Sequence, residues 1–383
     1  MKAIPESIKS KIGINLHKKL DHPISIVKNI IIKHLKSAFK KISNSDSEEI
    51  TVFDNLDCVV SVEDNFDLLL IPKTHPSRSE NDTYYVSPDK VLRTHTSAHQ
   101  NELLAKGYKS FLVVGDVYRK DTIDKFHYPV FHQIEGVYIS EHDNVAGVEK
   151  DLKFVLGYVV ENLFPGKEYR FAKDYFPFTD PSFEIEVRFD DKWVEILGSG
   201  VIQNEILTRN GIKKLGFAFG IGCERMAMIL FGITDIRKFW TNDERFLGQF
   251  KEGIINKFVP YPILPSSFAD ISFWINECDL DKSGAVAVAV AVAVAADKEE
   301  IISSWVKYND FSVMIREICS DDIEDTKCID KFYDKKRNRY SETFRLTFSP
   351  NKDENNHANF KKLINGYMEQ LYKKIPTLSV EPR

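Results

Sequence analysis

The stretch SFLVVGDVYRKDTIDKFHYPVFHQIEGVYI, residues 110–139, decides the fold, because two strand-like runs in it are joined by a short polar loop. The first run is apolar until its last residues and ends at Arg119. Runs of this length, rich in β-branched and aromatic residues, predict an antiparallel hairpin. Side chains alternate between the two faces of a strand, so Phe131, Gln133 and Glu135 share one face of the returning strand.

Gln133 and Glu135 therefore point together toward the face of the sheet that should be covered by other parts of the protein. An unpaired carboxylate is costly there. The pattern alone supports two interpretations equally, a structural salt bridge between the strands or a ligand site. Glu195 repeats the arrangement in WVEILG, residues 193–198, where it shares a face with Trp193 and Leu197. Two inward acids on neighbouring strands indicate a polar cavity.

Hairpin-spaced strands flank this stretch, at NFDLLLIP (65–72), FEIEVRF (183–189) and WVEILGSGVI (193–202). Helical spacing follows Pro23 as far as Ile42 and predicts an N-terminal helix. Antiparallel strands mixed with helices predict an α+β fold, not a βαβ series. GSGVIQ at 198–203 lacks the third glycine of a dinucleotide fingerprint, which excludes that class of fold.

The C-terminal part changes composition at the linker-like VPYPILP, residues 259–265. Beyond it we expect a strand, a helix, two strands and a final helix, at ADISFWI (269–275), 310–319, CIDKFY (328–333), ETFRLTF (342–348) and 359–373. This order predicts a ferredoxin-like α/β sandwich. We therefore expect a helical extension over 1–50, a larger domain over 51–257, and a linker with the sandwich over 258–383.

The Ala/Val run at 285–296 is too short to span a membrane, which takes roughly 20 apolar residues. Charged residues flank it on both sides, as they flank aggregation-prone segments, and we interpret the run as an insertion without function.

The whole chain has 383 residues, 43% of them hydrophobic and 28% charged, with a net charge of −5. These values are typical of a soluble globular protein and exclude a uniformly basic nucleic-acid binder. Any RNA contact must come from local patches such as Lys335, Lys336, Arg337 and Arg339. The 5 cysteines form no CxxC pair, which indicates reduced thiols. The basic N-terminus contains Glu6 and is a poor match to a transit peptide.

Three further patterns bear on chemistry. Ser97 with Gln100 fits a helix capping box or a ligand site equally well. His95 and His99 have a spacing that is compatible with a metal site, but no HExxH motif or cysteine pair lies beside them. Phe176 and Phe178 place two rings on one face, as core or as the wall of an aromatic pocket. In GFAFGIGCERMAMILFG, residues 216–232, glycines lead directly into a helix with Arg225 in its first turn. A cation there opposes the helix dipole unless it faces an anion, which indicates a phosphate site.

In this order, these segments resemble the single-chain phenylalanyl-tRNA synthetases of mitochondria and related organelles, which are class II enzymes. The resemblance covers about residues 12–260 and is strongest in NFDLLLIPKTHPSR (65–78), RTHTSAHQNELL (93–104), FLVVGDVYRKDTIDKFHYPVFHQIEG (111–136), YFPFTDPSFEIEV (175–187), WVEILGSGV (193–201) and GFAFGIGCERMAMILFGITDIR (216–237). It implies a class II antiparallel sheet flanked by helices, followed by an anticodon-binding sandwich. In the C-terminal part the Ala/Val run, CSDDIEDTK and LTFSP depart from the family pattern.

The resemblance implies activation of L-phenylalanine with ATP to phenylalanyl-adenylate and its transfer to the 3′-terminal ribose of tRNA(Phe), with release of AMP and diphosphate. The nucleophile is the carboxylate of the amino acid, whose pKa of about 3.5 keeps it ionised at pH 7. The site must therefore supply charge neutralisation and positioning. One alternative is a catalytically silent synthetase-like RNA-binding protein, which we would expect to have lost Arg119, Glu135 or Arg225. Another is a metal-dependent hydrolase built on the histidines His95, His99, His127 and His132.

The resemblance also implies roles for individual residues. The catalytic residues are Arg119, on the α-phosphate, and Arg225, at the γ end. Phe131 stacks on adenine and Glu195 lies nearest the Mg²⁺ that bridges the phosphates, so that the ATP-binding residues are Arg119, Phe126, His127, Tyr128, Phe131, Glu195 and Arg225. The amino-acid-binding residues are His95, Ser97, His99, Gln100, Gln133, Glu135, Phe176, Phe178, Ala218 and Phe219.

For the setting of the protein, the resemblance implies the mitochondrial matrix or another organelle such as a plastid, without membrane association. A monomer is expected, because the catalytic and anticodon-binding parts share one chain.

Overall fold

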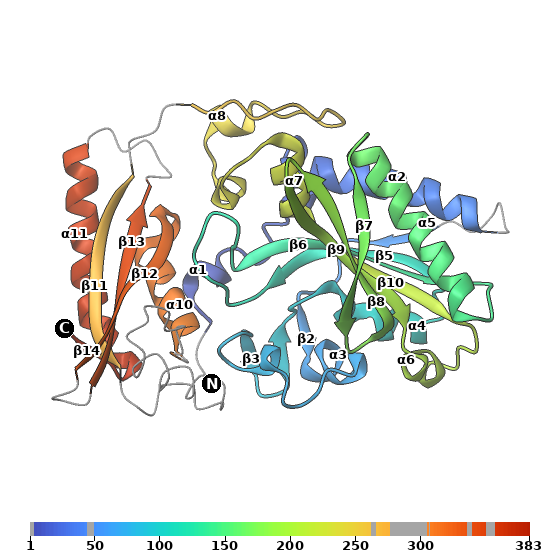
Figure 1. Cartoon of the computed structure of the whole chain (residues 1–383), viewed down its shortest axis with the longest axis horizontal. Helices are drawn as coiled ribbons and strands as arrows, with labels where there is room; N and C mark the ends of the chain where they lie inside the picture. The colour runs from blue at the N-terminus through green and yellow to red at the C-terminus, as the bar shows by residue number, and fades with distance from the viewer. Residues whose placement is uncertain are drawn as a thin grey trace. The chain divides into compact units, whose positions relative to one another are not determined.

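The computed structural model describes residues 4–43, 50–261, 266–275, 305, 307–334, 339–349 and 357–383. They group into two compact units, one dominated by residues 8–119 and 129–259, the other by 120–128 and 260–383 (Figure 1). The Ala/Val run at 285–296 and the basic residues at 335–337 lie outside the described residues. No helix in the described ranges is long and apolar enough to cross a membrane.

The first unit is built on a seven-stranded sheet in the order β1-β5-β6-β10-β9-β8-β7. β1 runs parallel to β5, and every other neighbouring pair is antiparallel, so the predicted antiparallel α+β sheet is confirmed. The strands are β1 (Thr51–Phe53), β5 (Ser110–Tyr118), β6 (Val130–Ile139), β7 (Tyr169–Phe176), β8 (Thr179–Phe189), β9 (Lys192–Ile202) and β10 (Gly216–Gly222). β5 and β6 form the hairpin expected from the sequence, with Val113 opposite Glu135 and Gly115 opposite Gln133.

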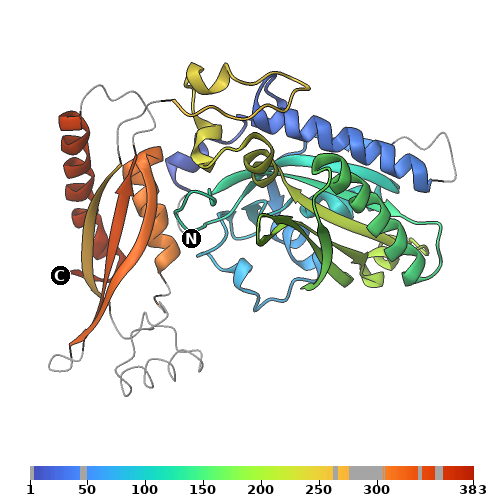
Figure 2. The ribbon, with the colours of Figure 1, turned by 45° about the horizontal axis from the view of Figure 1, so that its top comes forward.

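Helices α2 (Pro23–Ile42), α5 (Val145–Leu163) and α7 (Cys223–Phe231) cover one face of this sheet (Figure 2). α2 begins at a proline, and its buried side chains recur at helical spacing, as predicted. The Phe39 ring of α2 lies 5.3 Å from Tyr138 of β6 and 6.1 Å from Phe217 of β10, so these residues point toward the helices. Alternation along the strands then places Gln133 and Glu135 on the opposite face.

The prediction of a strand at NFDLLLIP is wrong, because the segment forms α3 (Val62–Asn65) and a 3-10 turn, η2 (Asp67–Leu69). The Ser61 hydroxyl caps α3 by accepting from the Asp64 amide. Phe66 and Leu69 are fully buried three residues apart, so a single helical turn buries the apolar run as well as a strand would.

The other described elements of the first unit are short. A three-stranded sheet has the order β2-β4-β3, from Val59–Ser61, Lys90–Leu92 and Tyr85–Ser87. The remaining helical elements are η1 (Leu16–Lys18), η3 (Pro76–Arg78), η4 (Thr96–His99), α4 (Gln100–Ala105), α6 (Asn204–Arg209), η5 (Ile236–Trp240) and α8 (Glu244–Leu247). The residues of α1 (Glu6–Lys9) are divided between the two units.

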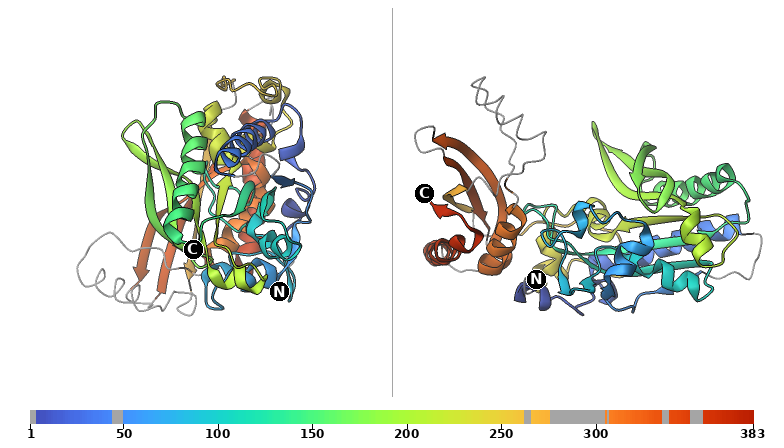
Figure 3. Two further views of the ribbon diagram at one scale, coloured as in Figure 1. Left: turned by 90° about the vertical axis from the view of Figure 1, so that its right-hand side faces the viewer. Right: turned by 90° about the horizontal axis from the view of Figure 1, so that it is seen from below.

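The second unit is a four-stranded antiparallel sheet in the order β12-β13-β11-β14. Its elements are β11 (Ser267–Ile275), α10 (Tyr308–Cys319), η7 (Ser320–Asp322), β12 (Ile323–Asp334), β13 (Arg339–Phe348), α11 (His357–Lys374), η8 (Ile375–Leu378) and β14 (Glu381–Pro382). The order βαββαβ and this strand arrangement confirm the ferredoxin-like prediction. Both helices pack on one face of the sheet (Figure 3), around a core that includes Phe273, Phe311 and Phe344.

Candidate active site

The face of the large sheet opposite α2, α5 and α7 is partly covered by α4 and α6, and its remaining part has a floor of glycines between acidic side chains. In register across four strands lie Glu135 of β6, Gly220 of β10, Gly198 of β9 and Glu184 of β8. A β-carbon added at Gly222 would meet nothing within 4 Å, and one at Gly220 would meet only the Gln133 amide, at 4.0 Å. The centre of this face is therefore bare backbone with open space above it, bordered by carboxylates and amides.

Glu135 lies at one border of the floor and is 3% exposed. The Ser97 hydroxyl donates a hydrogen bond to its carboxylate, and no ion pair joins Glu135 anywhere in the described ranges. The interpretation of Glu135 as one half of a structural salt bridge is therefore wrong. Burial raises the pKa of Glu135 to about 8, so its carboxyl group is mostly protonated at neutral pH.

The segment that follows β4 supplies this end of the site. The amide of Thr96 donates to the Gln133 side chain over 3.3 Å. Gln100 is 1% exposed, and neither atom of its side-chain amide has a hydrogen-bond partner within the described structure. Because Ser97 donates to Glu135 and lies within η4, the capping-box interpretation is wrong. Burial, with Arg119 nearby, lowers the pKa of His95 to about 3 and keeps that ring neutral.

Two aromatic rings border the glycine floor beside the polar side chains of Ser97, Gln100 and Gln133. Phe176 and Phe178 are stacked, with ring centroids 5.8 Å apart and planes within 12°. The Phe176 ring lies directly over Gly198, where an added β-carbon would come within 2.9 Å of it. Phe178 also packs against the cluster that contains Ala218.

Phe219 is not brought together with these residues. Its ring lies over Gly136, where an added β-carbon would come within 2.1 Å, and 6.3 Å from Phe39 of α2. It therefore points to the helix-covered face. His99 is also directed away from the floor, because its ring contacts Arg93 and Glu102.

Arg119 follows the last residue of β5, at the other end of the β6 side chains. Its Nε donates to the Thr94 carbonyl over 2.8 Å, and its guanidinium lies 5.2 Å from the centre of the Phe131 ring. Arg225, in the first turn of α7, donates to the Glu195 carbonyl over 3.1 Å. Two cations and one aromatic ring thus flank the same strands that carry Gln133 and Glu195.

Acidic side chains gather on β7, β8 and β9. The pKa of Glu184 is raised to about 7 by partial burial, by the charge of Glu195 and by Asp174. Such a set of oxygen donors fits a hard cation such as Mg²⁺. In the described part of the chain, no three His, Cys, Asp or Glu side chains form a group that could by itself hold a metal ion.

Phe126, His127 and Tyr128 belong to the second unit, where they form a tight turn. The Asp124 carboxylate accepts from the amides of Phe126 and His127, at 2.6 and 2.7 Å, and from the His127 ring. Tyr128 donates to Asp321 over 2.6 Å. Their predicted contact with a nucleotide stays a prediction.

The histidines of the hydrolase alternative do not converge on one point. His132 lies on the helix-covered face, where its ring and its amide both bond the carboxylate of Glu224, at 2.6 and 2.7 Å. His99 is held by Arg93, and His127 by Asp124. These three rings thus each have their own structural partner, whereas neither ring nitrogen of His95 has a hydrogen-bond partner within the described structure.

Residues 18–250 match the family described as the tRNA synthetases class II core domain (F), and this span contains all strands of the large sheet. The chain is 42% identical to phenylalanine–tRNA ligase, chloroplastic/mitochondrial, of Arabidopsis thaliana, over 90% of this chain and 75% of that protein. It is 39% identical to the mitochondrial phenylalanine–tRNA ligase of Mus musculus, over 90% and 78%. Among solved structures it is similar to pyrrolysyl-tRNA synthetase from Desulfitobacterium hafniense, with 14% identity, 61% and 78% coverage and a TM-score of 0.46.

The fold and the matched core are those of a class II tRNA synthetase. Within that class, the chain belongs to the phenylalanine–tRNA ligases of the mitochondrial and chloroplast type.

Proposed function

We propose that this chain activates L-phenylalanine with ATP and transfers it from phenylalanyl-adenylate to the 3′-terminal ribose of tRNA(Phe). One observation supports this most strongly. A bare glycine floor separates a buried, cation-free carboxylate from two arginines, on one face of a sheet that belongs to this family. The floor offers room for a substrate, Glu135 offers a partner for an ammonium group, and the arginines offer charge for phosphates.

At the amino-acid end, Glu135 receives the substrate ammonium group, helped by Ser97 and Gln133. The amide of Gln100, which has no partner in the described structure, is available for the same groups. The rings of Phe176 and Phe178 pack edge or face against the substrate ring, which suits the geometry that aromatic pairs prefer. The substrate carboxylate then points along the floor toward Arg119.

At the nucleotide end, Arg119 neutralises the α-phosphate as the carboxylate attacks in line, and diphosphate leaves toward Arg225. Phe131 supports the adenine ring. Mg²⁺ would be held by the phosphates with Glu195 and Glu184, and would supply charge neutralisation on the leaving diphosphate. The residues of this site act through position and charge, because no covalent enzyme intermediate is required.

The direct test is phenylalanine-dependent exchange between ATP and diphosphate, followed by charging of organellar against cytosolic tRNA. We expect exchange with phenylalanine and charging of the organellar tRNA. No exchange with any of the 20 standard amino acids would instead support a silent RNA-binding protein. Because the relatives carry mitochondrial or chloroplastic names, we place the chain in one of these organelles, and we expect a monomer in solution.

Ala218 sets the depth of the proposed pocket for the phenylalanine ring. It is 5% exposed on β10, and it packs in the cluster against which Phe178 lies. Replacement by glycine removes one methyl group, and a methylene-sized change in a hydrophobic pocket shifts specificity by roughly 10–200-fold. Ala218→Gly is therefore expected to raise the relative kcat/KM for para-substituted phenylalanines in the exchange assay. Unchanged ratios for these analogues would remove Ala218 from the pocket.

The open face of the second unit's sheet has the chemistry of a single-stranded RNA surface. Phe268 is 63% exposed on β11, and the Arg345 guanidinium lies 4.3 Å from the centre of its ring. Trp274 on the same strand face is approached by Arg339 at 5.1 Å and by Arg383 at 5.4 Å. Aromatic rings beside guanidinium groups stack on unpaired bases. We assign this face to tRNA.

Replacing Phe268 and Trp274 together by alanine is expected to raise the KM for tRNA in the charging assay by at least roughly tenfold, since each base–aromatic stack contributes about 1–3 kcal/mol. The exchange of ATP and diphosphate should be unaffected. Tyr372→Ala is the matched control, because Tyr372 is a 39% exposed aromatic residue on α11, outside this sheet face. An equal effect of the control, or normal charging by the double variant, would rule out this face.

A further inference from the structure

Arg93 is a fully buried cation that the sequence motifs did not single out as functional. It is 1% exposed and lies between β4 and η4. Its guanidinium occupies the position above Gly115, where an added β-carbon would come within 1.9 Å of Nη2. Gly115 pairs with Gln133 across the hairpin, so the guanidinium lies on the substrate-facing side of the sheet, beside a residue of the proposed site.

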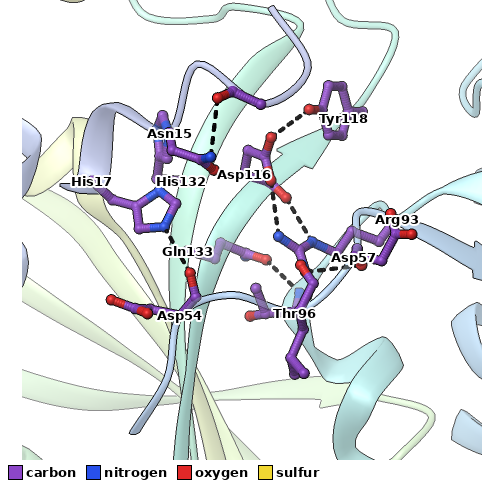
Figure 4. Close-up of polar contacts among 12 residues, drawn as sticks. Asn15, His17, Asp54, Asp57, Arg93, Thr96, Asp116, Tyr118, His132 and Gln133 are labelled. Atoms are coloured by element: carbon purple, nitrogen blue, oxygen red, sulfur yellow. Dashed lines mark hydrogen bonds and ion pairs between the residues drawn. The ribbon is translucent and has the colours of Figure 1, made fainter. Parts of the chain in front are cut away.

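The guanidinium joins three separate parts of the chain, and Figure 4 shows its bonds to two of them, at Asp116 and Asp57. Its Nε donates to the Asp116 carbonyl over 2.7 Å and its Nη2 to the Asp116 carboxylate over 2.9 Å, which fixes it to β5. Its Nη1 donates to the carbonyls of Leu56 and Asp57, both at 3.3 Å, and to Nε2 of His99 at 2.9 Å. The other carboxylate oxygen of Asp116 accepts from the Tyr118 hydroxyl.

The bond from Arg93 to His99 determines the state of that histidine. A guanidinium can only donate, so Nε2 of His99 must carry a lone pair and its proton must lie on Nδ1, which faces Glu102 at 3.6 Å. Burial and the charge of Arg93 lower the pKa of His99, in agreement with a neutral ring. Both ring nitrogens thus face protein groups, and neither is left for the substrate.

Arg93 and His99 therefore bracket the residues 94–98, which touch the proposed amino-acid site. Within this segment Thr96 bonds Gln133 and Ser97 bonds Glu135. The first residue, Thr94, is held independently, because Asn65 accepts from its amide over 3.0 Å and donates to its hydroxyl over 2.9 Å. Without the Arg93–His99 bond, Thr94 keeps its anchor, while His99 keeps only its contact with Glu102 at 3.6 Å.

We propose that Arg93 is a positioning residue that acts through His99 to hold Ser97 and Thr96 against Glu135 and Gln133, and so sets the geometry of phenylalanine binding without touching the substrate. This inference rests on the function proposed above. It assigns His99 to the support of the site and not to contact with the amino acid. Arg119 is affected little, since its bond to Thr94 depends on the Asn65 anchor.

The test compares two replacements of His99 in the full-length chain. His99→Met fills a similar volume but offers only a weak sulfur acceptor, whereas His99→Gln places a carbonyl oxygen near the position of Nε2. We expect His99→Met to raise the KM for phenylalanine in the exchange assay by roughly 10–100-fold, the scale of a displacement of about 1 Å. His99→Gln should stay within about 3-fold of wild type, and the KM for ATP within about 3-fold in both.

Arg93→Lys gives a second readout. A single ammonium group can pair with Asp116 or reach His99, but it cannot make both contacts at once as the planar guanidinium does. We expect it to match His99→Met in its selective effect on phenylalanine. If this variant does not fold, the two His99 variants still test the inference by themselves. Equal impairment of both His99 variants, a parallel rise of both KM values, or an unchanged KM in His99→Met would overturn the inference. Wild-type chain that shows no phenylalanine-dependent exchange would instead overturn the proposed function.

Discussion

Replacement of Arg119 by alanine is expected to lower phenylalanine-dependent exchange of ATP and diphosphate by more than about a hundredfold, the scale for losing one charge-stabilising donor. Arg119 is placed rigidly by its bond to the Thr94 carbonyl and by the Phe131 ring beneath its guanidinium. A group held in this way needs little reorganisation when charge develops on the α-phosphate. The loss should therefore fall mainly on kcat.

Two controls separate this effect from a structural one. Arg209→Ala removes an exposed arginine on α6 that pairs with Glu205, and should leave exchange unchanged. Arg119→Lys keeps the charge but loses the planar fork, and should recover only part of the activity. Near-normal exchange in Arg119→Ala would show that Arg119 only supports the 94–98 segment.

Glu135→Gln is expected to weaken phenylalanine binding and at the same time to stabilise the free protein. The substrate ammonium group would face a neutral amide in place of a carboxylate, and loss of one partner of a buried charge pair costs about 3–5 kcal/mol. This corresponds to an increase in Kd of roughly two to four orders of magnitude. Calorimetric titration with phenylalanine measures it directly.

The gain in stability follows from the raised pKa of Glu135, about 8 in the folded chain against the ordinary value of 4.5 for a glutamate. Between these values the folded chain holds a proton that the unfolded chain has released, so stability falls as pH rises from about 4.5 through 8. Glutamine removes this loss. At pH 8 we expect the Tm of Glu135→Gln to exceed that of wild type by at least about 2–4 °C, with no difference near pH 4.

The same pKa predicts that phenylalanine binding to the wild type releases close to one proton at pH 7, because the ammonium group favours the ionised carboxylate. Titrations in buffers with different ionisation enthalpies count that proton. A Glu135→Gln variant that binds phenylalanine as tightly as wild type, or that melts lower at pH 8, would contradict the assigned role.

Much of the fold could be predicted from the sequence, because strand and helix patterns there agree with the final packing. The hairpin, the ferredoxin-like unit and the start of α7 directly after the glycines of β10 belong to this group. The prediction of a strand at NFDLLLIP was wrong because a short apolar run fits a strand or a helical turn equally well. Its structure is set by a capping bond from Ser61, which competes with strand pairing.

The candidate site could be predicted only in part. Alternation along β6 correctly grouped Gln133 with Glu135, and the same alternation along β10 separates Ala218 from Phe219. That signal was present, and it would have placed Phe219 toward the helices. The arrangement of Arg93 and His99 carried no such signal, because it depends on a glycine in a distant strand leaving room for a guanidinium.

The bare floor at Gly220 and Gly222 also affects how natural variation in this chain should be interpreted. A methyl group added at Gly222 would meet no other part of the protein, so folding imposes little constraint there. Such a change would pass any screen based on expression or solubility and still occupy the space that we propose for the substrate. At these positions, the amount of folded protein and its activity are separate traits. A normal protein level therefore does not report whether the tRNA is being charged.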